Sequence, residues 1–522
     1  MMDTRSLARH MILASVAIPL SVRPVYASLP VAPFPLGNTN LVETRTEESL
    51  ADGVTYYSVR RATANNVPTQ WLITAGVART VKERSRLEMC LRALHLEPRR
   101  ESYQTPGLIP TRYVEIIGGD FTTEAAARVA IRPATTCKVE VRAAAASPYY
   151  EAGPWRLNLI EIDPAHFKGH IFSAGGNDTV AGRIKTSDIA HRFGAQVAIN
   201  GGFFAMTPEE GVVGEPAGIS VMQGRWRSEA TLGRPYLLLR DRYPISAAIL
   251  SARPPSPRIV WSDGTVSLLG GINRQPGQVR DCGTTGAPAN RLPAQDVTCA
   301  VRDEIVAITD DAGFVADASH GLAVTVGPDG RLKTGSGAEL GGTVLVGIGR
   351  KADFLRSRLA RHVRARMDLT YDTRSDKAAS SALYAVNGAP TLVRGGEMIH
   401  ADDKEGWATH GMPLARWNYV HSWSVLRNPR TAVGIDAKRH VWLLVVEGRE
   451  YSEASSVSVP ASAGLSIEEL RRVMVHIGAR DAINLDGGGS SAMVVRGKLI
   501  THPSDSSGER AVGDAILVVP DR

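Results

Sequence analysis

Hydrophobic and polar positions alternate along much of this chain, which predicts many strands and few helices. The stretch TYYSVRRA alternates from Thr55, and between Trp155 and Val519 short apolar runs are bounded by glycine and proline. Such runs are typical of strands joined by tight turns. We therefore expect an α+β fold, with a strand-rich domain over residues 155–520 and a small α+β module ahead of it.

The clearest predicted helix runs from Ser466 to Ile477. Its apolar residues recur every three or four positions and so lie on one face. Ser466 and Glu469 have the spacing of a capping box, and Gly478 ends the helix.

Residues 70–145 show a pattern of their own, with the predicted order β-α-β-β-α-β. The strands are expected at Trp71–Ile73, around Ser102, at Tyr113–Ile117 and at Lys138–Val141, and the helices at Val81–Leu94 and after Thr123. The stretch YVEIIGGDFTTEAAARVA resembles the second half of a SPOR domain, which implies peptidoglycan as a partner. The alternative is a plain α+β insertion without a ligand.

The first 27 residues have the pattern of a secretory signal peptide. Arg5 and Arg9 precede an apolar run from Met11 to Val22, and short residues stand before a cleavage site after Ala27. That run is too short to cross a bilayer, which disfavours an uncleaved anchor. We expect a periplasmic or secreted protein without a stable membrane span after cleavage. Residues 28–69 are expected to be a linker, up to residue 50, followed by the first strand of the large domain.

Composition and charge limit the class of protein. Of the 522 residues, 43% are hydrophobic and 22% are charged, which are values of a globular chain. The net charge of +7 is spread without a dense basic tract, so nucleic acid is not expected as a partner. The chain also lacks the GxSxG, HExxH, P-loop and complete GxGxxG motifs. The sequence therefore gives no support for a serine hydrolase, a zincin, an NTPase or a Rossmann enzyme.

The four cysteines suit an exported protein, because disulfides persist in oxidising compartments. We expect the pairs Cys90–Cys137 and Cys282–Cys299, since each pair lies inside one candidate module. The alternative is four buried free thiols.

An internal repeat is the most informative feature of the pattern. It comprises FGAQVAINGGFF at 193–204, IGARDAINLDGGGSS at 477–491 and the shorter YAVNGAP at 384–390. The two longer copies have the end of a helix, a short apolar strand, and then an asparagine with a glycine turn. We expect these strand ends to converge on one place, where loops can shape a site.

The loop of the copy at 477–491, which is the third in chain order, carries the most polar groups able to bind a ligand or take part in catalysis. Alternation places Asn484 and Asp486 on one face of the strand end. Three glycines, Gly487 to Gly489, allow a ligand to approach the backbone, and their amides could hold a phosphate. Ser490 and Ser491 add hydroxyl donors. The alternative is a plain hairpin turn in which Asp486 binds its own loop.

Two further segments offer polar groups. Asn200 ends the first repeat strand and could bind a sugar hydroxyl or position a carboxylate. Arg430 begins a strand and could bind phosphate through two hydrogen bonds, with a surface ion pair as the alternative. In the tail HPSDSSGERAVGDAILVV, Glu509 could be a general acid and Arg510 a second phosphate ligand.

Together, AINGGFF, GEPAG, LGRPYLLL, GINR, NGAPTLV, RTAVGI, NLDGGGSSAMVV and GERAVGDAILVV resemble the phosphodiester glycosidases. The resemblance covers about 155–519 in the expected order. It implies an exported hydrolase that cleaves glycosyl 1-phosphodiester linkages in envelope or extracellular polysaccharides. Two features depart from the family pattern: Glu215 stands where an aspartate is usual, and the segment from Cys282 to Cys299 looks like an insertion.

The resemblance implies catalytic roles for Asn200, Arg430, Asp486 and Glu509. Asp486 would be the base or nucleophile, Glu509 would assist proton transfer, and Arg430 and Arg510 would hold the phosphate. The expected substrate contacts are Gly201, Gly202, Glu215, Asn387, Thr431, Asn484, Gly487, Gly488, Gly489, Ser490, Ser491 and Arg510.

Two alternatives belong to other classes of protein. One is a non-catalytic envelope protein that binds anionic glycan or peptidoglycan, and the other is a glycosidase acting on neutral sugar links. No cofactor is expected. Asp486, Glu215 and Asp505 are conceivable ligands of a divalent cation, but no calcium-loop spacing supports one.

Overall fold

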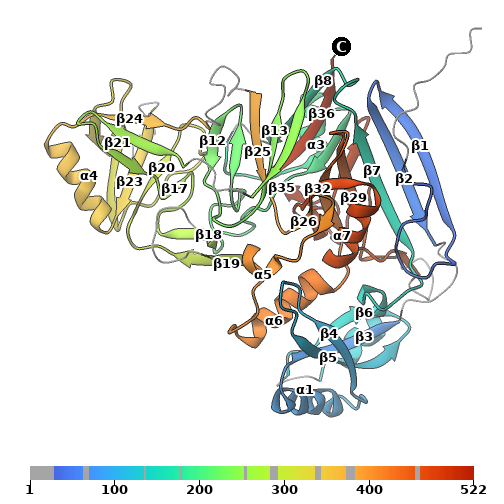
Figure 1. The fold of residues 1–522 in the computed structure, drawn as a ribbon. Coiled ribbons are helices and arrows are strands. Elements are labelled where there is room, and N and C mark those ends of the chain that lie inside the picture. Colours follow the sequence, from blue (N-terminus) through green and yellow to red (C-terminus); the bar gives the residue numbers. More distant parts are fainter. Residues whose placement is uncertain are drawn as a thin grey trace, which may run out of the picture.

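The computed structural model describes residues 29–521, apart from the segments 63–69, 134–136, 177–178, 252–255, 283–291, 336–341, 372–381 and 453–458. The expected signal peptide lies outside the described residues. A strand-rich body occupies one side of the molecule, a second strand-rich lobe the other, and a small module lies below the body (Figure 1). The predicted α+β, strand-rich fold is confirmed.

An eight-stranded sheet is the middle layer of the body, with the strand order β1-β2-β7-β29-β28-β32-β26-β27. Its central strands are buried along their length because both faces of the sheet are covered. The strands are β1 (Glu43–Ala51), β2 (Val54–Arg61), β7 (Trp155–Ile162), β26 (Thr391–Arg394), β27 (Glu397–Met398), β28 (Arg430–Asp436), β29 (Val441–Val446) and β32 (Ala479–Asn484).

Two five-stranded sheets pack against one face of this layer. Ile160, Val433 and Leu443 of the large sheet share a buried core with Val197 and Val386 of the smaller ones. The first sheet has the order β34-β33-β10-β36-β8, with β8 (Gly169–Gly175), β10 (Val197–Asn200), β33 (Met493–Val495), β34 (Lys498–Leu499) and β36 (Asp514–Pro520). The second has the order β12-β11-β25-β13-β14, with β11 (Ser220–Met222), β12 (Arg225–Ser228), β13 (Tyr236–Arg240), β14 (Ser246–Leu250) and β25 (Leu383–Asn387).

Helices cover the outer faces of these layers. Helix α7 (Ile467–His476) packs on the other face of the large sheet through its apolar stripe. Its capping box of Ser466 and Glu469 forms as predicted, and Gly478 follows with a φ of 87°. Helix α3 (Thr186–Phe193) covers the sheet that contains β10.

The second lobe packs around Trp261, Ile305, Leu345 and Leu355, in a core that continues into Val221 and Ala385 of the body. It contains β15 (Arg258–Trp261), β16 (Val266–Leu268), β17 (Gly271–Ile272), β20 (Glu304–Ile308), β21 (Gly321–Val326), β22 (Leu332–Thr334), β23 (Thr343–Ile348), β24 (Ala365–Asp368) and helix α4 (Arg350–Ala360). Smaller elements complete the chain: β9 (Ile184–Lys185) with β35 (Ala511–Val512), β30 (Glu450–Ser452) with β31 (Val459–Ser462), α5 (Asp402–Glu405) and the short helical turns 144–146 and 488–490.

A two-stranded hairpin projects from the junction of the body and the lobe. Its strands are β18 (Gln278–Cys282) and β19 (Pro293–Ala300), and the disulfide Cys282–Cys299 joins them. The other disulfide is Cys90–Cys137, so both predicted pairings are confirmed.

The small module has the predicted order of elements, β-α-β-β-α-β. They are β3 (Trp71–Ala78), α1 (Val81–Ala93), β4 (Arg99–Gln104), β5 (Arg112–Phe121), α2 (Glu124–Ala130) and β6 (Glu140–Ala143), and the sheet order is β4-β5-β3-β6. Since β2 pairs directly with β7, the module is an insertion between two neighbouring strands of the body.

The sheet of the module is covered on both faces. Leu87 and Leu91 of α1 pack on one face. On the other, Tyr113 packs against Trp417 of α6 (Leu414–Val420), which belongs to the body and continues into a π-helical turn, His421–Val425. The contact is polar as well: the Tyr113 hydroxyl lies 2.8 Å from His421 Nδ1. The module therefore supports a helix of the body.

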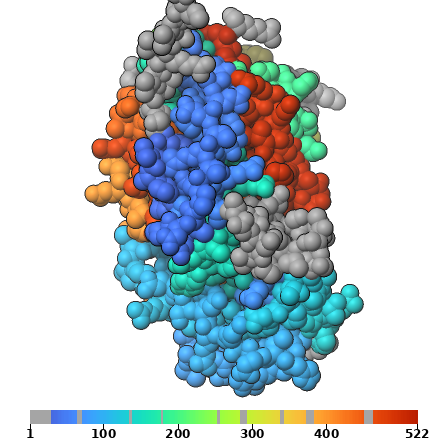
Figure 2. Space-filling model, turned by 90° about the vertical axis from the view of Figure 1, so that its right-hand side faces the viewer, coloured from blue at the N-terminus to red at the C-terminus, as the bar shows by residue number. Residues whose placement is uncertain are grey.

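The linker prediction is wrong for residues 43–50, which lie in β1 at the edge of the large sheet. Both faces of most of this strand are exposed, so its sequence ETRTEESLA shows no apolar alternation. Charged residues are typical of edge strands, because they discourage further pairing. Strands β1 and β2 form the blue surface above the module in Figure 2.

Candidate active site

The three repeat loops meet at one end of the body. Asn200 Nδ2 donates to the carbonyl of Asp486 over 2.8 Å, which joins the first loop to the third. Asn484 Nδ2 donates to the carbonyl of Ala389 over 2.8 Å, which joins the third to the second. The predicted convergence of the strand ends is confirmed.

The repeat asparagines hold the loops together and are not among the lining residues of the cavity described below. Asn200 accepts a hydrogen bond from the Thr431 hydroxyl over 2.6 Å, and Asn387 accepts one from the amide of Phe203 over 2.8 Å. Asn200, Asn387 and Asn484 are all buried. The structure thus gives these three residues, with Thr431, a positioning role.

A cavity of about 220 Å³ opens beside the third loop. Of the residues predicted from the sequence, Asp486, Gly487–Gly489, Arg430 and Arg510 line it. The other lining residues are Phe203, Phe204, Met206, Ala217, Arg280, Asp281, Gln295, Asp296, Tyr419, Trp423, Asn428 and Arg449. We take this cavity as the candidate active site.

Asp486 places a carboxylate in this cavity. Its Oδ1 accepts a hydrogen bond from the amide of Gly487 over 2.8 Å. Burial raises the pKa of Asp486 to about 6, although the hydrogen bonds and Arg510 oppose that shift. The group is therefore ionised at neutral pH and able to accept a proton or attack a carbon.

Arg430 brings a buried positive charge into the same cavity. Only 1% of its surface is exposed. Its Nε donates to the carbonyl of Leu465 over 2.8 Å, its Nη2 donates to the carbonyl of Trp423, and its guanidinium stacks on the Trp423 ring. Within the described part of the chain, no carboxylate forms an ion pair with it.

The electrostatics around Arg430 favour an anionic ligand. Burial, and then the neighbouring Arg449, lower its pKa to about 9. A bound anion would offset both effects. Arg510, in contrast, already has a partner, since its Nε and Nη2 bind both oxygens of Asp505 at 2.7 and 2.9 Å. Arg430 is therefore the better candidate for a phosphate ligand.

The glycines of the third loop allow close packing more than anion binding. Gly488 has a φ of 60°, and its amide donates to the carbonyl of Pro429. A Cβ on Gly489 would lie 2.2 Å from Asp505 Oδ1 and 2.3 Å from Arg510 Nη2. Two of the three amides expected to hold phosphate, those of Gly487 and Gly488, are already used within the protein.

The serines and the first glycines lie behind the cavity wall. The hydroxyl of Ser491 is buried and has no hydrogen-bond partner among the described residues, and the hydroxyl of Ser490 is buried next to the Asp486 carboxylate. The amide of Gly202 donates to Asp514 Oδ1 over 2.9 Å, and a Cβ on Gly201 would lie 2.2 Å from that same oxygen. Burial raises the pKa of Asp514, a residue not singled out in the sequence, to about 6.

Glu215 is buried away from the cavity. It accepts a hydrogen bond from the amide of Val212 over 2.9 Å, and burial raises its pKa to about 8. Because Asp505 is bound to Arg510 and Glu215 lies elsewhere, the structure does not assemble Asp486, Glu215 and Asp505 into a cation site.

Glu509 lies outside the cavity, at the start of α3. Its two oxygens accept hydrogen bonds from the amide and hydroxyl of Ser187 at 2.9 and 2.6 Å. A carboxylate in the first turn of a helix satisfies a free amide and interacts favourably with the helix dipole. This arrangement gives Glu509 a capping role where the sequence suggested a proton donor.

Replacing Glu509 with alanine is expected to lower the free energy of unfolding by about 1 kcal/mol, because α3 loses its cap. We expect kcat/KM to stay within about threefold of the wild type, since the side chain does not reach the cavity. Urea unfolding and steady-state kinetics measure the two effects. A loss of activity well beyond the loss of stability would return Glu509 to the catalytic residues.

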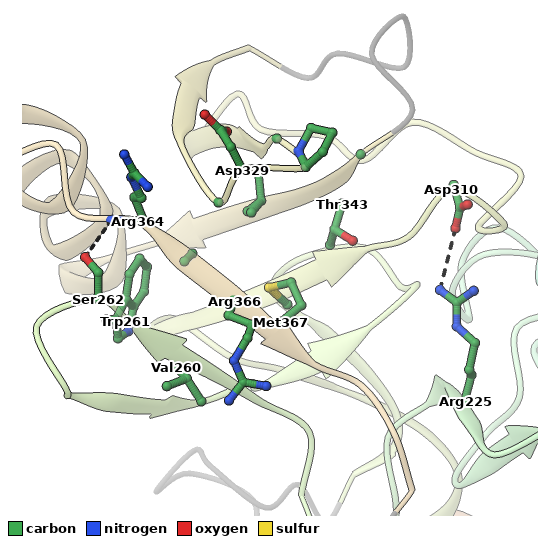
Figure 3. Close-up of a pocket in the computed structure, with 16 residues that line it drawn as sticks. Arg225, Val260, Trp261, Ser262, Asp310, Asp329, Thr343, Arg364, Arg366 and Met367 are labelled. Carbon is green, nitrogen blue, oxygen red and sulfur yellow. Dashed lines mark hydrogen bonds and ion pairs between the residues drawn. The ribbon is translucent and has the colours of Figure 1, made fainter. Parts of the chain in front are cut away.

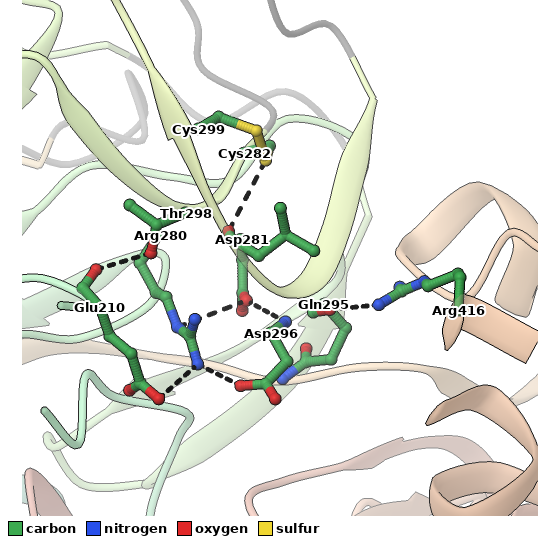
Figure 4. The surroundings of a disulfide bond; sticks show 10 residues. Glu210, Arg280, Asp281, Cys282, Gln295, Asp296, Thr298, Cys299 and Arg416 are labelled. Atoms are coloured by element: carbon green, nitrogen blue, oxygen red, sulfur yellow. Dashed lines mark hydrogen bonds and ion pairs between the residues drawn. A yellow bond between two sulfur atoms is a disulfide. The ribbon is translucent and has the colours of Figure 1, made fainter. Parts of the chain in front are cut away.

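The hairpin of β18 and β19 forms one wall of the cavity. Most of it is the segment from Cys282 to Cys299 that the sequence predicts to be an insertion. Figure 4 shows Arg280 between Glu210 and Asp296, beside the Cys282–Cys299 disulfide. Arg280 lies 3.3 Å from Glu210 and also pairs with Asp296. Burial raises the pKa of Asp296 against the opposing effect of Arg280, and 47% of its side chain is exposed. This wall adds a second accessible carboxylate to the cavity.

A larger cavity, of about 760 Å³, lies in the second lobe. Trp261, Arg364 and Arg366 line it, and Arg225 and Asp310 pair at its edge (Figure 3). It contains none of the residues predicted from the sequence.

The strand-rich fold and the cavity, with its carboxylates and buried arginine, define a candidate enzyme site that can accept an anionic ligand. A family model described as phosphodiester glycosidase matches residues 303–519, so this stretch is similar to that family. That stretch contributes Arg430, Asp486 and Arg510 to the cavity. The described residues contain no helix long and apolar enough to cross a membrane.

Known proteins are similar to this chain in sequence or in structure. Over 76 residues, 15% of this chain, the chain is 37% identical to bovine N-acetylglucosamine-1-phosphodiester alpha-N-acetylglucosaminidase, and the match spans 12% of that relative. A Burkholderia pseudomallei protein described as exported has a similar structure, with a TM-score of 0.81 and 29% identity over 94% of this chain and 99% of that one. A hypothetical protein from Synechocystis shares the fold, with a TM-score of 0.50 and 15% identity over 92% of this chain and 76% of that one.

Proposed function

We propose that this protein is an exported hydrolase that cleaves glycosyl 1-phosphodiester linkages in envelope or extracellular polysaccharides. The observation that carries the proposal is the pairing, in one cavity, of the Asp486 carboxylate with the buried and unneutralised Arg430. A phosphodiester joined to a sugar offers both features such a cavity needs: an electrophilic anomeric carbon and an adjacent anion.

Arg430 binds the phosphate in this mechanism. Two of its nitrogens are held by backbone carbonyls, which fixes the guanidinium, and Nη1 is the nitrogen left to face the cavity. As the sugar–oxygen bond breaks, negative charge grows on the phosphate, and a fixed cation in a buried site stabilises that charge strongly. Arg449 adds positive charge on the same side.

Asp486 acts at the anomeric carbon. It either attacks that carbon or takes a proton from an attacking water, and the configuration of the released sugar distinguishes the two routes. The leaving phosphomonoester is a weaker base than a sugar alkoxide, so it needs less help from an acid. Asp296 of β19, which also pairs with Arg280, is the exposed carboxyl group of the cavity wall that would give that help.

The export of this protein is part of the proposal. Its support is the pair of disulfides, the signal-peptide pattern of residues 1–27 and the similar Burkholderia protein described as exported. Peptidoglycan binding by the small module stays a prediction, which a sedimentation assay with purified peptidoglycan tests.

Hydrolysis of a panel of sugar 1-phosphodiesters by the purified mature chain tests the function. Release of free sugar together with a phosphomonoester is the expected result, and neutral aryl glycosides should be poor substrates. Turnover of neutral glycosides alone would indicate an ordinary glycosidase. Glycan binding without any turnover would indicate a non-catalytic envelope protein.

Replacing Asp296 with asparagine is expected to lower kcat/KM by about 100-fold, the lower end of what general acid catalysis contributes, because the leaving phosphomonoester needs little help. The decrease should be smaller for substrates with more acidic leaving groups. Asp329→Asn, in the larger cavity of the second lobe, is the matched control. Equal activity of D296N and wild type at all pH values would remove Asp296 from the mechanism.

A further inference from the structure

Three side chains from neighbouring strands converge at the end of the large sheet that is remote from the cavity. Glu161 lies near the end of β7, Asp436 ends β28, and His440 directly precedes β29. One carboxylate oxygen of each acid and one imidazole nitrogen lie within 4.8 Å of one another. Since Arg430 begins β28 and Asp436 ends it, this cluster is about 20 Å from the cavity.

Each of the three side chains is held by the atom that does not face the cluster. Glu161 Oε2 accepts a hydrogen bond from the Tyr57 hydroxyl over 3.0 Å, which leaves Oε1 directed inward. Asp436 Oδ1 accepts hydrogen bonds from the amides of Lys438 and His440, both at 2.9 Å, while Oδ2 has only a long contact of 3.4 Å from Trp442 Nε1. His440 Nε2 lies 3.7 Å from Asp163 Oδ2, which leaves Nδ1. Such outer contacts are what orients the ligands of a metal ion.

The two most buried atoms of the cluster have no hydrogen-bond partner. Glu161 Oε1 and His440 Nδ1 are both buried and unpartnered, in residues that are 2% and 6% exposed. They lie only 2.8 Å apart, yet not in the geometry of a hydrogen bond. Two buried ligand atoms this close together, without a hydrogen bond between them, are expected where both bind one ion. A protonated histidine paired with Glu161 would instead direct its N–H at that oxygen.

We propose that Glu161, Asp436 and His440 bind one divalent transition-metal ion, of the zinc class. One imidazole nitrogen with two carboxylate oxygens is a donor set that Zn²⁺ accepts, and a three-residue set leaves a position for water. The ion would also neutralise the negative charge of Glu161 and Asp436, to which the nearby Asp163 adds. Asp436 Oδ2, which lies 3.3 Å from His440 Nδ1, completes the set.

The ion joins the turn between β28 and β29 to β7, so its role is to stabilise the large sheet. Nothing in this assignment depends on the proposed hydrolase activity, because the cluster and the cavity lie at opposite ends of β28. Metal binding and catalysis can therefore fail independently.

The experiment uses the full mature chain, without a histidine tag, after dialysis against a chelator. Titration with Zn²⁺ in a calorimeter should show one equivalent bound with a Kd of about 1 μM or tighter, and the Tm should rise by about 3 °C or more at saturating Zn²⁺. Glu161→Gln and His440→Gln should each weaken this binding at least about tenfold. X-ray absorption should give Zn–N and Zn–O distances of about 2.0–2.2 Å.

The control is His170→Gln, which removes an exposed histidine that also pairs with a carboxylate, that of Asp241. It should bind Zn²⁺ like the wild type. Absence of a stoichiometric site in the wild type would overturn the proposal, and so would unchanged affinity in both E161Q and H440Q. Glu161→Gln preserves the size of the side chain, so at least one variant tests the ligand set in a folded protein.

Discussion

Replacing Asp486 with asparagine is expected to lower kcat/KM for sugar 1-phosphodiesters by at least about 1,000-fold. Asparagine keeps the size of the side chain but can neither attack the anomeric carbon nor accept a proton. The variant therefore loses the reactive carboxylate without a change in the shape of the cavity. Release of phosphomonoester from the best substrate of the panel measures the effect. Arg430 and the rest of the cavity remain, so substrate binding should change little.

The wild-type pH profile gives a second signature of Asp486. Because its pKa is raised from 3.8 to about 6 and the active form is ionised, kcat/KM should rise with pH and level off above about 6. A raised carboxyl pKa contributes stability that is fully present below about pH 4 and is lost as the pH rises through about 6. At pH 8, Asp486→Asn should therefore be at least as stable as the wild type, which separates lost chemistry from lost folding. Full activity in D486N would remove this residue from the mechanism.

Replacing Arg430 with lysine is expected to lower kcat/KM by about 100- to 1,000-fold, although the positive charge is kept. Lysine loses the planar fork, of which two nitrogens are held by the carbonyls of Leu465 and Trp423. The ammonium can then no longer be fixed towards the phosphate. Side-by-side kinetics on a phosphodiester and on an activated aryl glycoside should show a much larger loss on the phosphodiester.

Arg427→Lys is the matched control for this variant. Arg427 is also buried and belongs to the same segment, but it pairs with Glu469 at 2.7 Å and does not line the cavity. We expect it to lower stability without changing the preference for phosphodiesters. Equal losses on both substrates in R430K would mean that Arg430 supports the structure only.

Some of the site could be predicted from the sequence because the informative residues lie in short local patterns. Asp486 follows an apolar strand and Arg430 begins one. The alternation of side chains along a strand predicts the face to which such residues point. The same local pattern does not decide the role of Asn200, Asn387 and Asn484. A strand-end asparagine serves a ligand or a neighbouring loop equally well, and the hydrogen bonds to loops distant in the sequence are visible only in the structure.

Other parts depend on contacts that no local pattern contains. Glu509 caps α3 through Ser187, which is 322 positions earlier in the chain. Arg280 and Asp296 lie in the hairpin that looked like an insertion, so nothing marked them as part of the cavity wall. Strand β1 lacks alternation because it is an edge strand exposed on both faces. In each case the deciding information is tertiary.

The insertion of the small module between β2 and β7 restricts how this protein can be divided or engineered. Its sheet packs on α6, and the segment that follows α6 supplies Trp423 to the cavity. A shortened variant that joins β2 to β7 directly would expose Trp417 and His421, on the segment that leads to Trp423 of the cavity. The module is thus expected to be needed for a folded candidate site. A relative that lacks such a module must cover this helix in another way, so expression trials should begin with the whole assembly.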